Sequence, residues 1–385
     1  MLMNYFKSAG SVKPCSHLKY FGILPHFRMT TDSKIKVAVL DDYQNLSKSY
    51  FSAVAPDRLE FTYFPNTLHP KHSESDHAAL VELLKPFPVI SSMRERTPFP
   101  ASILKALPNL KLLLTTGKRN LAIDLAAASE MGIVVAGTDA KHSIPPSKFN
   151  RIRPDSTTTH CWAMILGLSR HIARDDRNVK QGGWQGNTLA VALPGKTLAL
   201  CGLGRLGTAV GRIAVMGFGM RVICWSSSLT QEKADEQARS VGLEPGEFEV
   251  VSKEELFKQA DVLSVHYVLS DRSRGIVGKK ELELMKPEGL LVNTSRGPLV
   301  DNDALYDILV QGKIAGAALD VFDMEPLPLD SRWRTTRWGE DGRAELLLTP
   351  HMGYGETETI KGFYKESAEN LARWLRGEKP TIQLN

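Results

Sequence analysis

The sequence predicts an α/β protein with two mostly parallel β-sheets, and three observations support this fold class. From Ile35 onward, short apolar runs alternate with segments of helical spacing, which is the pattern of successive βαβ units. A proline-rich, basic segment at Ser143–Ser156 interrupts the pattern, which starts again at Thr197 and so indicates a second sheet. The length of 385 residues, with 42% hydrophobic and 24% charged residues, suffices for two domains with buried cores.

The first series consists of apolar runs and the helical segments between them. The runs predicted as strands are Ile35–Leu40, Leu59–Phe64, Pro88–Ser91, Lys111–Thr116 and Ile133–Gly137. The segments predicted as helices are His77–Leu84, Pro100–Leu107 and Asn120–Met131.

The second series follows a long helix, which we expect to run from Thr158 to Lys180 and to end at Gly182–Gly183. An amphipathic segment at Glu356–Arg376 predicts a terminal helix, and Arg332–Arg343 is expected to be an exposed, charged loop. The strands predicted in this series are Thr197–Gly202, Met220–Trp225, Asp261–Tyr267, Gly289–Ser295, Ala315–Phe322 and Glu345–Pro350.

Composition excludes several classes of partner. The formal net charge of +5 is not concentrated in a long Lys/Arg run, so we expect no nucleic-acid partner. No stretch reaches the roughly 18 consecutive apolar residues of a membrane span, so we expect no membrane partner. The four cysteines have neither metal-site nor disulfide spacing, and we expect no metal site but buried, reduced thiols.

Residues 1–33 precede the first expected strand and are expected to form a disordered or targeting-like extension. No acidic residue occurs before Asp32 although four residues are basic, a bias found in mitochondrial transit peptides. The low arginine content and two prolines argue against a targeting helix. We therefore expect a cytoplasmic protein, with mitochondrial import as the alternative.

The segment Gly202–Gly207 (GLGRLG) closes an expected strand and opens an expected helix, which is the setting that a dinucleotide-binding turn requires. Gly202 would allow the tight turn, Gly204 would let the pyrophosphate approach the backbone, and Gly207 would allow helix–strand packing. Arg205 and Leu206 lie in the first turn of that helix, whose positive end would face the phosphates.

The second strand of this unit would normally end in an acid that binds the ribose hydroxyls, but here it ends at Ser226 and Ser227. A serine does not repel a 2′-phosphate, and Lys233 is the nearest downstream cation. Both NAD(H) and NADP(H) stay open as cofactors, with NADPH slightly favoured.

Arg296, Glu325 and His351 each follow an apolar run, in the segments NTSRG, DVFDMEPLP and TPHMG. Alone, each has an ordinary explanation as a surface ion pair, a solvated acid or a structural histidine. Together at strand ends they suggest one site, because ligands of open α/β sheets bind outside the carboxyl ends of the strands. An arginine can hold a carboxylate through two bonds, and a histidine beside an acid can transfer a proton.

With RTPFP at Arg96–Pro100, Leu107–Leu125 and SVHYVLS at Ser264–Ser270, these motifs make the chain resemble the D-isomer-specific 2-hydroxyacid dehydrogenase family. The resemblance implies two Rossmann-like domains, with the cofactor domain inserted into a flavodoxin-like substrate domain. Residues 34–156 and 352–385 would form the substrate domain and residues 157–351 the dinucleotide-binding domain. A homodimer formed through the linking helix is also implied.

The family reaction transfers a hydride between NAD(P)H and a 2-oxo acid to give a D-2-hydroxy acid. Arg296 would hold the substrate carboxylate, His351 would supply the proton, and Glu325 would orient His351. Backbone N–H groups near Gly117 would hold the second carboxylate oxygen. Further expected substrate contacts are Met93, Arg94 and Lys118. Further expected cofactor contacts are His266, Thr294, Ser295, Asp320 and Gly353.

Two departures from the family pattern leave questions open. Tyr267 follows His266 where many members have a proline, and Thr159 stands where a glutamate often precedes His160. A dinucleotide-sensing scaffold or corepressor of the same fold is the alternative function, because an intact catalytic trio does not exclude it. Neither the 2-oxo acid nor the physiological direction follows from the sequence.

Overall fold

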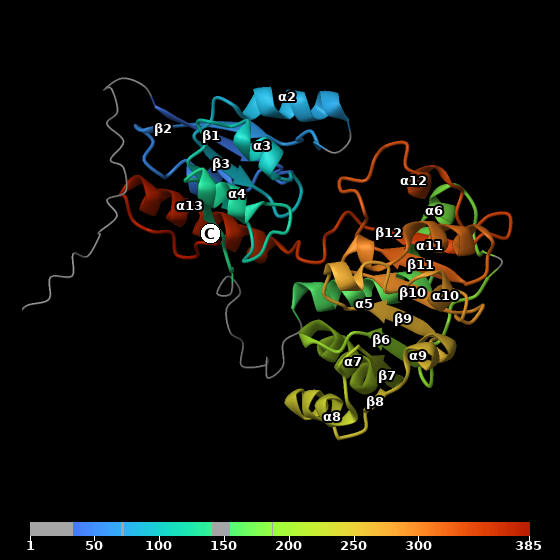
Figure 1. Ribbon diagram of the computed structural model, residues 1–385. Coiled ribbons are helices and arrows are strands. Elements are labelled where there is room, and N and C mark those ends of the chain that lie inside the picture. The colour runs from blue at the N-terminus through green and yellow to red at the C-terminus, as the bar shows by residue number, and fades with distance from the viewer. Residues whose placement is uncertain (1–33, 71–72, 141–154, 187) are drawn as a thin grey trace, which may run out of the picture.

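The computed structural model describes residues 34–70, 73–140, 155–186 and 188–385. These residues form two parallel sheets that lie side by side, each with its own helices (Figure 1). This arrangement confirms the predicted α/β class. The sequence-based expectations for the amino-terminal extension and for most of the basic segment after Ser143 lie outside the described residues.

The first sheet, as far as the described residues define it, has five parallel strands in the order β2-β1-β3-β4-β5, which is the flavodoxin-like order. Its strands are β1 Ile35–Leu40, β2 Leu59–Phe64, β3 Val89–Ser92, β4 Leu112–Thr115 and β5 Val134–Ala136. Its helices are α1 Lys48–Phe51, α2 Glu74–Leu84, α3 Ala101–Lys105, α4 Leu125–Glu130 and α13 Thr357–Leu375.

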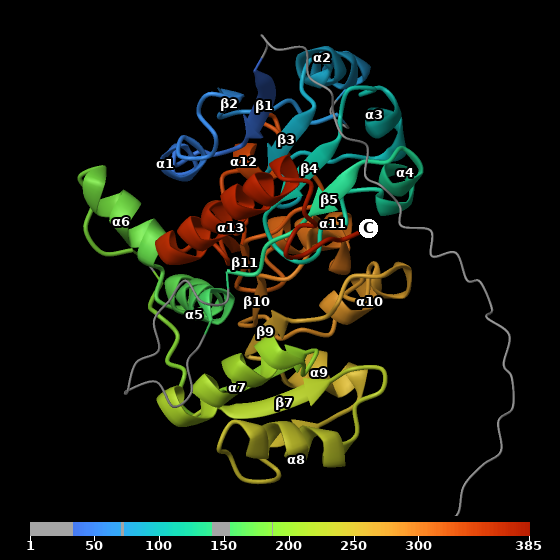
Figure 2. The same cartoon turned by 90° about the vertical axis from the view of Figure 1, so that its left-hand side faces the viewer.

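The side chains of each strand point alternately to the two faces of the sheet, and each face has its own hydrophobic core. One face packs against α2, α3 and α4, and the other packs against α1 and α13, which lie on opposite sides of the strands in Figure 2. Helix α13 comes from the far end of the chain, and Gly137 N–H donates to Ile382 O at 2.9 Å to fasten the segment beyond it. The carboxyl-terminal segment therefore packs on the first sheet, although the chain before it belongs to the second.

The second sheet, within the described residues, has seven parallel strands in the order β12-β11-β10-β9-β6-β7-β8, the doubly wound order of dinucleotide-binding folds. Its strands are β6 Thr197–Cys201, β7 Arg221–Trp225, β8 Phe248–Val250, β9 Val262–Val265, β10 Leu290–Asn293, β11 Gly316–Leu319 and β12 Glu345–Leu348. Its helices are α5 Ser156–Ser169, α6 Ile172–Lys180, α7 Arg205–Phe218, α8 Gln231–Ser240, α9 Lys253–Gln259, α10 Lys279–Leu282, α11 Asn302–Val310 and α12 Arg332–Thr335, with 3₁₀ turns at Asp271–Ser273 and Gly297–Leu299.

The expected single helix from Thr158 to Lys180 is two helices, α5 and α6. His171 interrupts it with a left-handed backbone, φ +56°. The ring of His171 bridges two other segments, because Nδ1 lies 2.7 Å from Glu345 Oε2 and Nε2 lies 3.0 Å from Leu189 O. These tertiary contacts favour the break over continued helix, and helical spacing alone does not encode them.

The segment Arg332–Arg343 is only partly the exposed, charged loop that was expected. Arg334, Arg337 and residues 339–342 are exposed. The segment also contains α12, and the Trp333 side chain is buried in the core of the second sheet, stacked at 5.9 Å on Trp338. The Arg332 guanidinium lies 4.2 Å from the centre of the Tyr306 ring.

Three further expectations can be compared with the structure. Strand β8 was not expected, and the helix expected at Asn120–Met131 is limited to α4. Cys161, Cys201 and Cys224 are buried free thiols, as expected, and burial raises their pKa to about 11, 12 and 12. In the part of the chain that the structure describes, no helix is both long and apolar enough to cross a membrane.

Candidate active site

The turn between β6 and α7 is packed so closely that two of its glycines admit no side chain. Gly202 has φ +106°, and a Cβ there would lie 2.8 Å from His266 O. A Cβ on Gly207 would lie 2.3 Å from Gly202 O. At Gly204, by contrast, no atom lies within 4 Å of the Cβ position, so the backbone borders open space. This cradle fits a dinucleotide pyrophosphate.

The first turn of α7 carries Arg205 and Leu206 directly after the N-cap residue Gly204. Arg205 is exposed and forms an ion pair with Asp155 at the start of α5, whereas Leu206 is half-buried. The helix has 14 residues, and its free amide groups point into the open space beside Gly204.

Ser226 and Ser227 follow directly after β7, the strand next to β6 and its glycine turn. Ser227 N–H donates to Tyr267 Oη at 3.1 Å, and the Tyr267 hydroxyl donates to Ser227 Oγ at 2.9 Å. The Tyr267 ring also stacks on Trp225 at 6.0 Å. Tyr267, which stands where many family members have a proline, therefore holds the turn at Ser226 and Ser227 in place.

The predicted contacts after β9 and β10 lie along the same edge of the sheet. His266 Nε2 lies 2.8 Å from Ser264 Oγ, and burial lowers the pKa of His266 to about 4, so the ring is neutral at neutral pH. Ser295 Oγ donates to Tyr267 O at 2.8 Å. Thr294 is buried, and its hydroxyl has no hydrogen-bond partner within the described chain.

Arg296 is presented by a tight polar turn at the end of β10. The buried Asn293 amide accepts a bond from Ser295 N–H and donates one to Arg296 O, both at 3.0 Å. A Cβ on the next residue, Gly297, would lie 2.1 Å from the Phe322 carbonyl carbon. Only glycine allows this approach, which brings the arginine turn against the loop that carries Glu325.

Glu325 and His351 form a direct pair. Glu325 Oε1 accepts a bond from Phe322 N–H at 2.8 Å, and Oε2 lies 2.5 Å from His351 Nδ1. His351 is 8% exposed and has a left-handed backbone with φ +54°, which is uncommon for histidine. Because Nδ1 faces the carboxylate, Nε2 is the ring atom left to exchange a proton with a ligand.

Asp320 holds this strained turn on both sides of His351. Its fully buried carboxylate accepts bonds from Thr349 Oγ1 at 2.6 Å, Met352 N–H at 2.8 Å and Gly353 N–H at 3.0 Å, and His160 Nε2 lies 3.1 Å away. Burial alone would raise the pKa of Asp320, but these hydrogen bonds hold it below its ordinary value of 3.8. The predicted cofactor contacts of Asp320 and Gly353 stay predictions.

On the side of the first sheet, Arg94 follows the buried Met93 with a left-handed backbone, φ +49°. Arg94 N–H donates to Thr116 Oγ1 at 3.0 Å, and the guanidinium lies 5.2 Å from the centre of the Tyr354 ring. A Cβ on Gly117 would lie 2.2 Å from Arg94 Nη1. Gly117 is therefore needed so that the Arg94 side chain can cross above the β4 turn.

The Gly117 amide bonds to a neighbouring turn of the first sheet. Gly117 N–H donates to Thr138 Oγ1 at 2.8 Å, and the expected role of the N–H groups near Gly117 in holding a substrate carboxylate stays a prediction. The neighbouring Lys118 is exposed, and its Nζ lies 2.7 Å from Asp139 Oδ2. The amide is engaged because the β4 and β5 turns are fastened to one another, a contact that local sequence does not reveal.

Comparison with known proteins agrees with this geometry. Residues 162–353 match the family described as D-isomer specific 2-hydroxyacid dehydrogenase, NAD binding domain. A glyoxylate reductase of Thermococcus litoralis is 32% identical over 291 residues, which cover 74% of this chain and 79% of that protein. The chain belongs to this family. It is thus a nicotinamide-dependent oxidoreductase of the 2-hydroxyacid dehydrogenase class, as the sequence predicted.

Two further relatives support the assignment of this dehydrogenase. A hydroxypyruvate reductase of Thermotoga maritima is 31% identical, with 78% of this chain and 90% of that protein covered. The crystal structure of a phosphoglycerate oxidoreductase of Vibrio cholerae O395 superposes with a TM-score of 0.74 at 32% identity. That match covers 89% of this chain and 99% of the other.

Sequence reasoning missed two charged residues of the dehydrogenase site, Glu95 and Arg96. Glu95 Oε1 lies 3.3 Å from Arg296 Nη2, and Oε2 lies 3.6 Å from Arg94 Nε. Burial by itself would raise the pKa of Glu95, but Arg94 and Arg296 hold it below its usual range. The available signal was the run of alternating charges at Arg94–Arg96, directly after a predicted strand.

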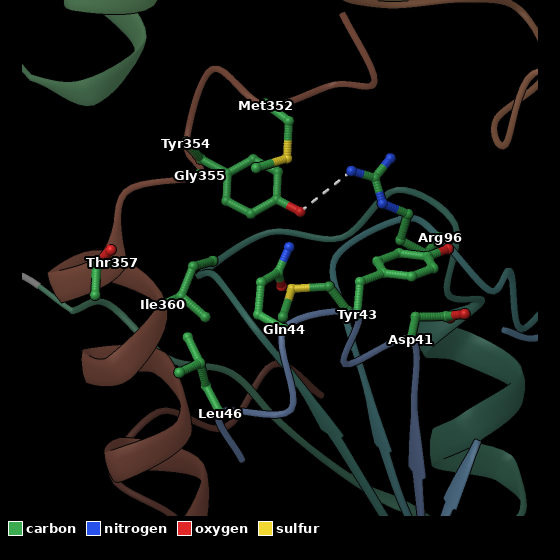
Figure 3. A pocket seen from close by; sticks show the side chains of 11 residues that line it. Asp41, Tyr43, Gln44, Leu46, Arg96, Met352, Tyr354, Gly355, Thr357 and Ile360 are labelled. Carbon is green, nitrogen blue, oxygen red and sulfur yellow. Dashed lines mark hydrogen bonds between the residues drawn. The ribbon is translucent and has the colours of Figure 1, made fainter. Parts of the chain in front are cut away.

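Two cavities lie at the junction of the two sheets. One of about 550 Å³ is lined from both sheets, by Glu325 and His351 on one side and by Tyr43 and Arg96 on the other. The second, of about 90 Å³, lies between the β1 turn and the start of α13 (Figure 3). Glu325 and His351 thus border open space, whereas Arg296 is not among the residues that line either cavity.

We predict that Asp320→Asn destabilises the fold by about 1–3 kcal/mol, because an amide leaves buried donors unpaired. The folded-state pKa of Asp320 is the lower one, so its ionised form stabilises the fold above pH 3.8 and this contribution is lost as the pH falls below that value. The stability difference between wild type and variant should therefore shrink below pH 3.8 in urea unfolding curves.

The exposed Asp57→Asn variant should change the free energy of unfolding by no more than about 0.5 kcal/mol. A wild-type and Asp320→Asn difference that stays constant down to pH 2 would contradict the assigned role, since the pKa of Asp320 would then be the same in the folded and unfolded states.

Proposed function

We propose that the chain reduces a 2-oxo acid to a D-2-hydroxy acid with NADH or NADPH, with Arg296, Glu325 and His351 as its catalytic residues. The observation that carries the proposal is the 2.5 Å contact between His351 Nδ1 and Glu325 Oε2, which leaves Nε2 as the proton donor. Arg296 is brought to the same place through the close approach of Gly297 to Phe322.

Arg296 binds the substrate carboxylate and polarises the adjacent carbonyl. Its planar guanidinium offers paired N–H donors, which suit a carboxylate better than the point charge of a lysine does. Glu95 Oε1 accepts from one of these donors, Arg296 Nη2, at 3.3 Å. A substrate carboxylate therefore competes with the Glu95 carboxylate for Arg296, and it also lies close to Arg94.

His351, protonated, donates the proton from Nε2 to the carbonyl oxygen as the carbon is reduced. A bound nicotinamide supplies the hydride. Glu325 holds the ring orientation through Nδ1 and stabilises the positive charge of the imidazolium before transfer. The reverse reaction uses the same pair, with neutral His351 as the base.

The cofactor would be held by the second sheet and the substrate by both sheets. We assign residues 157–351 to the dinucleotide-binding domain and residues 34–156 and 352–385 to the substrate domain. Substrate contacts are proposed for Met93, Arg94, Gly117, Lys118 and Arg296. Cofactor contacts are proposed for Gly202, Gly204, Arg205, Leu206, Gly207, Ser226, Ser227, His266, Thr294, Ser295, Asp320 and Gly353.

The choice of cofactor is proposed from the serine turn. No acid stands at Ser226 to repel a 2′-phosphate, and Lys233 Nζ donates to Ser228 O at 3.1 Å, which places a cation beside the turn. Both features favour NADPH slightly over NADH.

A homodimer is proposed from the exposed apolar residues of α6 and the segment after it. Ile172 is 60% exposed, Val179 50%, Trp184 77% and Leu189 91%, which is unusual for side chains of this size on a monomer surface. Sedimentation equilibrium would measure the oligomeric state. Three buried free thiols support a cytoplasmic location.

The test of the proposed function is a turnover assay with purified protein, both reduced cofactors and a panel of 2-oxo acids. The panel should include glyoxylate, hydroxypyruvate and aromatic 2-oxo acids, and the product should be identified by chiral chromatography. Formation of a D-2-hydroxy acid is expected. Tight dinucleotide binding without turnover of any 2-oxo acid would instead favour a sensing scaffold.

We predict that His351→Asn lowers kcat by roughly 10²–10⁴-fold, because asparagine cannot act as a general acid although it fills much of the space of the imidazole. Cofactor affinity, measured by fluorescence titration of the reduced dinucleotide, should change little. His77→Asn on α2 serves as the control and should keep wild-type kcat. Wild-type turnover in His351→Asn at neutral pH would refute the assignment of the proton donor.

We predict that Ser226→Asp shifts the preference towards NADH. At an effective dielectric of about 20, two like charges ~4 Å apart repel by roughly 4 kcal/mol, and exposure and salt reduce this to about 1–3 kcal/mol. The NADPH/NADH ratio of kcat/KM should therefore fall by about one to two decades.

The control for this variant is Ser240→Asp at the end of α8, which adds the same charge away from the turn and should leave the ratio unchanged. An unchanged ratio in Ser226→Asp itself would mean that Ser226 does not face the adenine ribose.

A further inference from the structure

Arg96 extends from the loop after β3, in the first sheet, to the main chain on either side of the His351 turn. Its Nη2 donates to Pro350 O at 2.9 Å, to His351 O at 3.2 Å and to Tyr354 Oη at 3.4 Å, the last drawn in Figure 3. The side chain is 9% exposed, so these bonds are largely shielded from water. The Arg96 guanidinium thus holds the His351 turn through the main-chain oxygens of that turn.

The same guanidinium also faces the catalytic carboxylate. Arg96 Nη1 lies 3.8 Å from Glu325 Oε2, the oxygen that contacts His351. Burial by itself would lower the pKa of Arg96, but Tyr354 and Glu325 raise it, so the side chain stays charged. The titratable and charged groups that face the Glu325–His351 pair or Arg96 are Asp41 and Tyr43 after β1, Arg94, Glu95 and Arg96 after β3, Arg296 after β10, Arg334 in α12 and Tyr354 after His351.

We propose that Arg96 is a positioning residue that holds the His351 turn and balances the charge of Glu325 during proton transfer. This inference rests on the proposed reductase function. His351 loses its positive charge when it donates its proton, and Glu325, whose side chain is 16% exposed, then keeps an unbalanced negative charge. The Arg96 guanidinium compensates that charge, so it favours the state after transfer.

This role has two separable parts. The hydrogen bonds to two carbonyl groups need the fork of a guanidinium, which lysine lacks. The compensation of charge needs only a cation near Glu325, which lysine supplies. Arg96→Lys should therefore lose the first part and keep much of the second, whereas Arg96→Gln should lose most of both.

The experiment measures kcat and kcat/KM for reduction of the best 2-oxo acid from pH 5 to 10 at saturating cofactor. In Arg96→Gln, kcat should fall roughly 10–100-fold and the alkaline limb should move up by roughly one pH unit, because the protonated His351–Glu325 pair is no longer opposed by a cation. In Arg96→Lys, kcat should fall while the alkaline limb stays near its wild-type position.

Arg373→Gln is the matched control. Arg373, on α13, also donates to a main-chain oxygen, that of Lys379 at 2.7 Å, and it is not among the residues that line the cavity of about 550 Å³. This control should keep wild-type kcat and pH profile. In Arg96→Ala, millimolar guanidinium should restore part of kcat, whereas urea of the same shape but no charge should not.

An alkaline limb in Arg96→Gln that coincides with wild type, or equal recovery of Arg96→Ala by urea and guanidinium, would overturn the charge role. An unchanged kcat in Arg96→Lys would overturn the role of the guanidinium fork. Failure of the wild type to reduce any 2-oxo acid would reject the proposed function, which separates that failure from a failure of the Arg96 inference.

Discussion

The buried carboxylate of Asp320 is the constraint on which the catalytic turn depends. It accepts hydrogen bonds from residues on both sides of His351, so the histidine is held in a left-handed backbone conformation that it would rarely adopt alone. A carboxylate meets this requirement because it offers several lone pairs and no proton that would clash with a main-chain N–H. The position of His351 relative to Glu325 is a consequence of this buried anchor.

The architecture could be predicted from sequence because it rests on local and periodic signals. Apolar runs between helical segments marked nearly all the strands, and the glycines of the β6–α7 turn are placed by steric needs that are visible in a short motif. The break at His171 and the burial of Trp333 could not be predicted, because both depend on partners far away in the chain. The helix break depends on the contact of His171 with Glu345, and the burial of Trp333 depends on the core of the second sheet.

The candidate site was predictable to a similar degree. The Glu325–His351 pair is in contact, and Arg296 faces the same junction, as the strand-end placement suggested. The engagement of the Gly117 amide with Thr138 was not predictable, since it requires the geometry of two neighbouring turns. Glu95 and Arg96 were overlooked because alternating charges after a strand are typical of solvated loops. In the folded protein Glu95 contacts Arg296, whereas Arg96 faces Glu325.

The chain leaves the second sheet after β12 and reaches α13, on the first sheet, within a few residues, and His351 lies in that short crossing. Points near a pivot are displaced least when two bodies rotate about it. A rotation of the sheets about this connection would therefore leave His351 and Glu325 paired. The contact between Arg296 on the second sheet and Glu95 on the first would instead change with the angle between the sheets.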